Sequence, residues 1–127
     1  MIRVAVGILQ RDNRILVAER PVHKPYRGYW EFPGGKIEAH ETGEQALQRE
    51  LHEELGIQVV AATPWFQHQH DYPDKSVLLE LFRVTEFSGE PHGKEAQCLQ
   101  WASFEELMAL KLLEGNLAIL GRVREIL

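Results

Sequence analysis

Apolar residues recur along the chain with two different periods, and these periods separate predicted strands from predicted helices. The apolar runs at 2–10 and 14–20 flank the polar turn Arg11-Asp12-Asn13, which predicts a β-hairpin. Further predicted strands span 57–62, 65–70, 76–87 and 97–102, with a short fragment at 30–32. Polar, Pro-rich or Gly-rich stretches predict loops at 23–29, 71–74 and 88–96, and a turn at Pro33-Gly34-Gly35.

Residues 43–55 instead carry the period of a helix. The apolar positions on one face are Leu47, Leu51 and Leu55. Thr42 precedes the segment as a good N-cap, and Gln45 three residues later completes a capping box. Gly56 is a natural C-cap. The segment is therefore predicted to be a helix that packs its leucine face on the body of the protein.

Two more helices are predicted near the C-terminus. Ser103 with Glu106 forms a second capping box, and residues 116–127 resemble a closing amphipathic helix. The order of β-rich, helical, β-rich and helical segments indicates an α/β protein with a mixed sheet covered by helices. We find no internal repeat or linker, and we expect residues 1–127 to form a single domain.

Composition narrows the class of protein. The chain has 127 residues, 44% hydrophobic and 26% charged, with a net charge of −5. These values fit a soluble globular domain and give no long-range attraction to nucleic acid. No apolar run approaches the ~20 residues of a membrane span. The lone Cys98 fits a reducing compartment, so we expect a cytoplasmic protein in which Cys98 packs as a small hydrophobe.

Acidic residues crowd one flank of the predicted helix. Glu50, Glu53 and Glu54 fall within roughly 100° of helical arc. Like charges at these spacings oppose the helix by about 0.2–0.5 kcal/mol per pair, so a cation is expected to compensate them. A glutamate-rich helix is more often only a solvated face. An oxygen-rich cluster of this kind suits Mg²⁺, with Mn²⁺ as a substitute, usually together with substrate phosphates.

The surrounding residues match a known pattern. The spacing Gly35-x5-Glu41-x7-Arg49-Glu50-Leu51-x-Glu53-Glu54-x-Gly56-Ile57 matches the Nudix box at every defined position. Segments 4–8, 31–38, 73–75 and 89–95 extend the similarity over nearly the whole chain. The chain thus resembles the MutT-type 8-oxo-dGTP diphosphatases of the Nudix hydrolase family. The resemblance implies an α/β/α sandwich with a mixed sheet between helices, and hydrolysis of a nucleoside triphosphate to its monophosphate and pyrophosphate.

Catalytic and metal-binding roles follow from this chemistry. A triphosphate repels water, and metal ions both neutralise its charge and lower the pKa of bound water. The expected metal ligands are the Gly35 carbonyl, Glu50, Glu53, Glu54 and, from the resemblance, Glu95. The resemblance makes Glu50 a candidate general base, but which carboxylate takes the proton stays open. Arg49 is expected to orient the acids by charge-assisted hydrogen bonds.

Substrate contacts are expected outside the helix. The resemblance makes Arg20 a phosphate contact and Asn116 the residue that pairs with an oxidised purine. Lys36 is either a phosphate contact or a solvated turn residue. Phe32 and Tyr72 either line the base pocket or pack as ordinary aromatics. The prolines that usually flank the asparagine in MutT-type proteins are missing here.

Alternative functions therefore remain open. A Nudix hydrolase that prefers pyrimidine triphosphates, such as CTP or 5-methyl-dCTP, is the nearest alternative. A non-catalytic nucleotide sensor is another, although such domains typically lose box carboxylates and none is lost here. We expect a monomer that acts on small nucleotides, and neither nucleic acid polymers nor membranes as partners.

Overall fold

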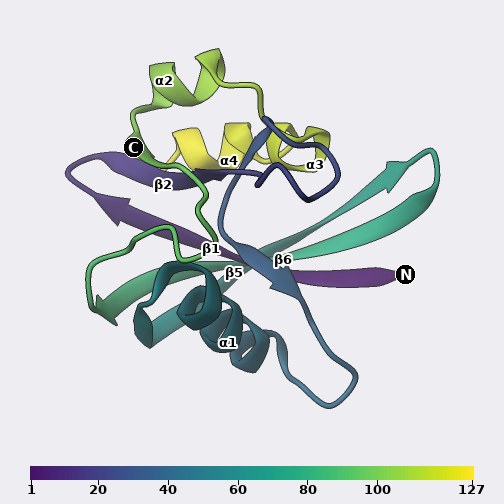
Figure 1. Cartoon of the computed structure of the whole chain (residues 1–127), viewed down its shortest axis with the longest axis horizontal. Helices are drawn as coiled ribbons and strands as arrows, with labels where there is room; N and C mark the ends of the chain where they lie inside the picture. The colour runs from purple at the N-terminus through teal and green to yellow at the C-terminus, as the bar shows by residue number, and fades with distance from the viewer.

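The computed structural model describes all 127 residues (Figure 1). Its strands are β1 (Ile2–Arg11), β2 (Arg14–Glu19), β3 (Trp30–Glu31), β4 (Gly34–Lys36), β5 (Gln58–Tyr72), β6 (Lys75–Ser88) and β7 (Leu99–Ala102). Its helices are α1 (Gly43–Leu55), α2 (Phe104–Ala109), α3 (Glu114–Leu117) and α4 (Leu120–Arg124). No helix is long and apolar enough to cross a membrane.

The strands form one mixed sheet. Its main order is β3-β2-β1-β6-β5, with β4 paired to β1 and β7 to β2. β1 and β6 run parallel, whereas the other pairs are antiparallel. Helix α1 covers one face of the sheet, and α2, α3 and α4 cover the other (Figure 1). The predicted α/β/α sandwich is confirmed.

Two apolar layers hold the helices on the sheet. On the α1 side the fully buried leucine face of the helix packs with residues such as Ala5 and Phe82. On the other side Val6 and Ile8 pack with the buried side chains of the C-terminal helices. Successive β1 residues thus alternate between the two layers, as the period of a strand requires. Gly7 leaves room for the helix, because a Cβ there would lie 3.1 Å from the Leu51 side chain.

The ends of α1 are as the sequence predicts. The Thr42 hydroxyl accepts a hydrogen bond from the Gln45 backbone, and the Gln45 side chain accepts one from the Thr42 N–H. Gly56 ends the helix with φ of 70°, a left-handed conformation that costs glycine nothing. The predicted β1–β2 hairpin and the strand at 76–87 are also present, the latter as β6.

Three predictions of local structure were wrong. Residues 34–36 form strand β4 instead of a turn, because they pair with β1, where a Cβ at Gly34 would collide with the Ala5 carbonyl. The two strands predicted at 57–62 and 65–70 are one strand, β5, with irregular pairing around Pro64. The closing helix is instead two short helices, α3 and α4, each with a glycine in it and neither with a side-chain N-cap bond.

Cys98 also differs from expectation. We predicted that it packs as a small hydrophobe, but its side chain is exposed. It is the last residue of the loop after β6, directly before strand β7. The prediction rested on how often cysteines are buried in proteins in general. That frequency does not say whether a particular cysteine beside a strand faces the core or the solvent.

Candidate active site

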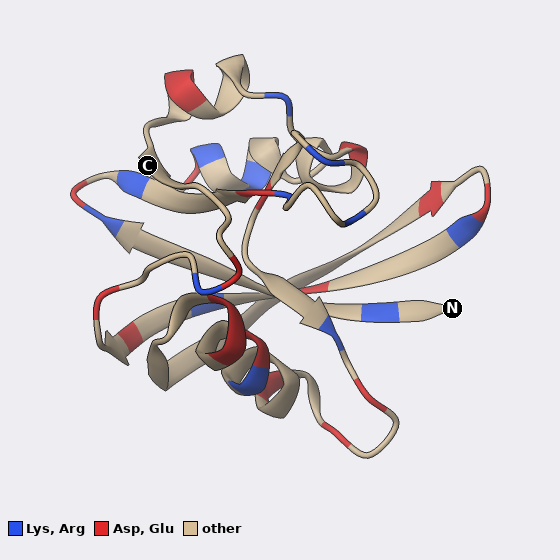
Figure 2. Ribbon diagram, viewed as in Figure 1, with Lys and Arg blue, Asp and Glu red and all other residues tan.

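Helix α1 carries the Nudix-box acids and packs beside the glycines of strand β4. The Glu50 side chain lies directly over Gly35, so that a Cβ at Gly35 would collide with the Glu50 carboxyl group. Glycine is therefore needed here for the close approach of a carboxylate. Acidic residues gather along the side of α1 that faces the loop after β6 (Figure 2).

Arg49 forms ion pairs with several acids of this site. Its Nη1 donates to Glu50 Oε1 at 2.8 Å and lies 3.6 Å from Glu53 Oε2. Its Nε and Nη2 donate to the two carboxylate oxygens of Glu41 at 2.7 and 2.9 Å. These bonds to Arg49 lower the pKa of Glu41 to about 2. Glu41, which was not among the predicted site residues, thus accepts two short bonds that hold Arg49 in place, together with the bond to Glu50.

Glu54 lies in the opposite electrostatic environment. Burial, followed by the neighbouring charges of Glu50, Glu31 and Glu95, raises the pKa of Glu54 to about 8. Among the neighbouring charges only that of Lys24 lowers the pKa of Glu54. Negative charge is therefore in excess at this point.

Glu95 faces the same place from the loop after β6. Its carboxylate lies 3.4 Å from Lys24 Nζ. The loop is fixed to the end of α1, because the Lys94 N–H donates to the Glu54 carbonyl at 3.1 Å. The two parts of the predicted site are thus held together by main-chain bonds.

The donor chemistry fits a hard divalent cation. Three carboxylates on α1, a fourth on the loop and the glycine main chain at β4 could supply oxygen ligands, and the mutual repulsion of the carboxylates favours a cation. In this structure no three acidic, His or Cys side chains already surround a common point.

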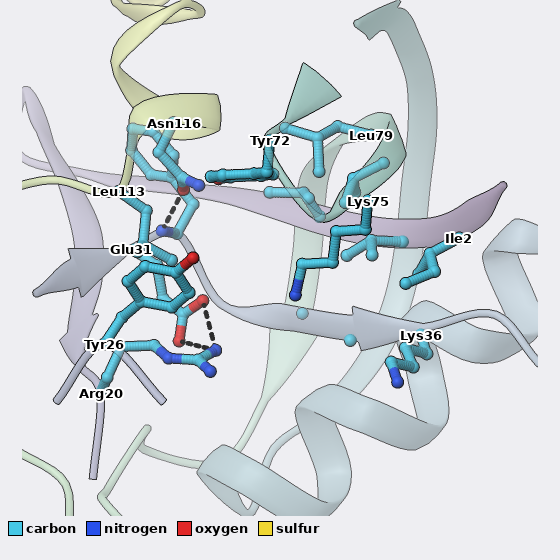
Figure 3. A pocket seen from close by; sticks show the side chains of 16 residues that line it. Ile2, Arg20, Tyr26, Glu31, Lys36, Tyr72, Lys75, Leu79, Leu113 and Asn116 are labelled. Carbon is cyan, nitrogen blue, oxygen red and sulfur yellow. Dashed lines mark hydrogen bonds and ion pairs between the residues drawn. The ribbon is translucent and has the colours of Figure 1, made fainter. Parts of the chain in front are cut away.

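A cavity of about 200 Å³ opens beside these acids (Figure 3). It brings together all five residues predicted to bind substrate, together with the predicted ligand Gly35. These residues are Arg20, Phe32, Lys36, Tyr72 and Asn116. The predicted acidic metal ligands do not line this cavity; they are Glu50, Glu53, Glu54 and Glu95. The catalytic and binding candidates are therefore neighbours that meet at Gly35 in strand β4.

Asn116 is buried at one end of the cavity. Its Oδ1 accepts a hydrogen bond from the Phe32 N–H at 2.8 Å. The amide nitrogen turns away from this bond toward Tyr72 (Figure 3). Tyr72 itself accepts a hydrogen bond from the Gly115 N–H at 3.1 Å through its hydroxyl. A donor group is thus presented at a defined position in the cavity wall.

Cationic side chains line the other part of the cavity. Arg20 is held by Glu31, at 3.3 Å, and by the Pro25 carbonyl, at 3.0 Å. Lys75 extends across the cavity toward β4, the strand that carries Lys36 (Figure 3). The cavity can therefore offer positive charge next to the acidic helix.

Sequence reasoning gave no site role to Glu31 or Lys75, although both line the cavity. Burial raises the pKa of Glu31, and Arg20 opposes this shift. Glu31 could have been noticed as a single acid inside an apolar strand fragment, and Lys75 as part of the segment 73–75 that extends the family similarity.

Comparison with known proteins identifies the family. The NUDIX domain family matches residues 1–121. The chain is 43% identical to an 8-oxo-dGTP diphosphatase of Proteus vulgaris, over 76% of this chain and 88% of that protein. It is 38% identical to a CTP pyrophosphohydrolase of Escherichia coli, over 94% and 89%. The solution structure of the E. coli ORF135 protein superimposes with a TM-score of 0.86 at 36% identity, covering 99% of this chain and 90% of that one. The acidic helix, the glycine strand β4 and the adjoining cavity are thus features of a chain that belongs to the Nudix hydrolase family.

Proposed function

We propose that this protein is a Mg²⁺-dependent nucleoside triphosphate pyrophosphohydrolase whose preferred substrate is 8-oxo-dGTP. The observation that carries the proposal is the single cavity that has the Asn116 amide in its wall and meets the acidic cluster at Gly35. A base at Asn116 would direct its phosphates toward Lys36 and Lys75 and then to the carboxylates. In the cytoplasm this activity would remove a mutagenic precursor from the nucleotide pool.

The metal would be held by Gly35, Glu50, Glu53, Glu54 and Glu95. When bound, Mg²⁺ neutralises phosphate charge and lowers the pKa of the attacking water, and Mn²⁺ can replace it. Glu50 is our first candidate for the group that accepts the proton from this water. Arg49 keeps Glu50 oriented through its 2.8 Å hydrogen bond, and its own position depends on Glu41.

Hydrogen-bond chemistry at Asn116 favours an oxidised purine. An amide can donate from its nitrogen and accept at its oxygen along one base edge. 8-Oxoguanine presents an acceptor, O6, next to a donor, the N7–H, whereas guanine presents two acceptors there. The Asn116 oxygen already accepts from Phe32, but a carbonyl oxygen has a second lone pair. The match to 8-oxoguanine is therefore complete, and the match to guanine lacks one hydrogen bond.

A preference for pyrimidine triphosphates such as CTP or 5-methyl-dCTP is the second candidate. It is favoured by the similarity to the E. coli CTP pyrophosphohydrolase over 94% of this chain. The chain also lacks the prolines that usually flank the asparagine in MutT-type proteins. A non-catalytic sensor role is disfavoured, because every carboxylate of the box is retained.

Pyrophosphate release from a panel of 8-oxo-dGTP, dGTP, CTP and 5-methyl-dCTP, measured with Mg²⁺, tests the proposal. We expect the highest kcat/KM for 8-oxo-dGTP and no turnover in EDTA. A higher kcat/KM for CTP would replace the oxopurine assignment by the pyrimidine one. Absence of turnover for all four nucleotides would refute the hydrolase proposal for this substrate class. Size-exclusion chromatography of the same protein tests our expectation of a monomer.

A further inference from the structure

The loop after β6 is bound to the end of helix α1 by its main chain. The His92 N–H donates to the Leu55 carbonyl at 3.0 Å, and the Lys94 N–H donates to the Glu54 carbonyl at 3.1 Å. Carbonyls in the last turn of a helix have no partner inside the helix, so the loop satisfies groups that would otherwise need water. The loop that carries Glu95 is therefore tied to the helix that carries the other acids.

One side chain completes this attachment. Gln97 donates from Nε2 to the Glu54 carbonyl at 3.0 Å and accepts at Oε1 from the Glu95 N–H at 2.8 Å. A main-chain carbonyl can only accept and a main-chain N–H can only donate, so these partners fix the orientation of the amide. Gln97 thus joins the main chains of two acids that lie on different elements.

The local backbone is shaped to bring Gln97 back to Glu95. Ala96 between them has φ of 63°, a left-handed conformation that residues other than glycine rarely adopt. The Ala96 N–H closes this turn on the Gly93 carbonyl at 3.0 Å. A Cβ at Gly93 would collide with the main-chain oxygen of Gln97. The turn therefore requires a residue without a Cβ at position 93, and it places the Gln97 amide beside Glu95.

Only an amide of this length makes both bonds. A glutamate at position 97 would accept from Glu95 but could not donate to Glu54, and a methionine would do neither. Through its two bonds Gln97 links the backbone of Glu54 directly to the backbone of Glu95. The separation of these two carboxylates consequently depends on how firmly the loop is held to the helix.

We propose that Gln97 is a positioning residue that sets the spacing of Glu54 and Glu95 for divalent-cation binding. The inference rests on the proposed function, since it takes these two acids as ligands. Gln97 would not touch substrate, because it lies outside the nucleotide cavity. Its loss would therefore act on metal affinity and kcat and leave the KM for nucleotide little changed.

The test compares Gln97→Met with a matched control, Gln100→Met. Gln100 is also partly buried, but its side chain bonds to Glu106 at 3.5 Å, away from the acids. Mn²⁺ binding to the nucleotide-free protein is measured by electron paramagnetic resonance, and kcat and KM by pyrophosphate release. We expect Gln97→Met to weaken Mn²⁺ affinity and lower kcat, each by about 10- to 100-fold, as found for residues that orient metal ligands. Gln100→Met should change neither.

Unchanged Mn²⁺ affinity in Gln97→Met would overturn the proposal, as would an equal loss in both variants. Gln97→Glu is the second variant should Gln97→Met fail to fold, and a wild-type Mn²⁺ affinity in it would overturn the proposal equally. Glu54→Gln and Glu95→Gln are measured in parallel. If these two weaken Mn²⁺ binding while the Gln97 variants do not, only the role of Gln97 is refuted. If none of the variants affects Mn²⁺ binding, the proposed ligand set is refuted as well.

Discussion

Glu54 provides the sharpest test of the electrostatics of this site. In the metal-free protein, burial and the charges of Glu50, Glu31 and Glu95 raise the pKa of Glu54 from 4.5 to about 8. At a pH where Glu54 is ionised in the unfolded chain, this shift lowers the free energy of unfolding. We predict that Glu54→Gln, which replaces the carboxylate by a neutral group of the same shape, stabilises the metal-free protein while it impairs hydrolysis.

The pKa difference gives the size of this effect. Each unit corresponds to about 1.4 kcal/mol, so a pKa raised to about 8 penalises the folded state by up to about 4 kcal/mol at pH 8. Glu54 is only partly enclosed, and solvent screening reduces this to about 2 kcal/mol. The sign follows from proton linkage. Between pH 4.5 and 8 the folded state binds more protons than the unfolded one, so wild-type stability falls as the pH rises through this range.

Urea denaturation in EDTA at pH 5 and pH 8 measures the difference. We expect Glu54→Gln to exceed the wild type by about 2 kcal/mol in the free energy of unfolding at pH 8 and by little at pH 5. Glu53→Gln is the matched control, because Glu53 lies on the same helix with 56% of its side chain exposed. Added Mg²⁺ should reverse the order by stabilising the wild type. A variant less stable than the wild type at pH 8, or a difference independent of pH, would refute the reasoning.

Three further predictions concern the neighbouring residues. Glu50→Gln should lower kcat by about 10²- to 10⁴-fold with an unchanged circular dichroism spectrum; retained turnover would remove Glu50 from the mechanism. Asn116→Ala should leave the Phe32 N–H without its partner, which lowers the free energy of unfolding by about 1–3 kcal/mol and lowers the kcat/KM ratio of 8-oxo-dGTP to dGTP. Arg49→Lys cannot form the paired bonds to Glu41, so the pKa of Glu41 should rise from about 2 toward 4.5 in a carboxyl NMR titration, and an unshifted pKa would contradict this account.

Helix α1 could be predicted closely because all the signals that define it lie within one continuous segment. The Thr42–Gln45 capping box, the leucine face and Gly56 depend on residues at most one or two turns apart. The arc that holds Glu50, Glu53 and Glu54 follows from the helix geometry alone. The acidic half of the candidate site was therefore readable before its neighbours in space were known.

Strand β4 shows what a local pattern cannot provide. Two glycines after a proline predict a turn, because glycine adopts the required dihedral angles freely. In the structure the same glycines serve the close approach of β4 to Ala5 and of Gly35 to Glu50. Gln97 was overlooked for the same reason. Its importance comes from one bond to a neighbouring loop residue and one to the distant end of α1.

The position of Asn116 in the cavity depends on contacts with residues far away in the sequence. For this reason the sequence left the base preference open. The prolines that flank the asparagine in MutT-type proteins would restrict the backbone locally, and this chain lacks them. Here the restraint comes from two hydrogen bonds to other elements, from the Phe32 N–H to Asn116 and from the Gly115 N–H to Tyr72. The first bond orients the Asn116 amide, and the second holds the backbone of the short helix α3 one residue before it. The missing prolines therefore do not by themselves argue against an oxopurine site, because Phe32 fixes the side chain of Asn116 and Tyr72 fixes the backbone at Gly115.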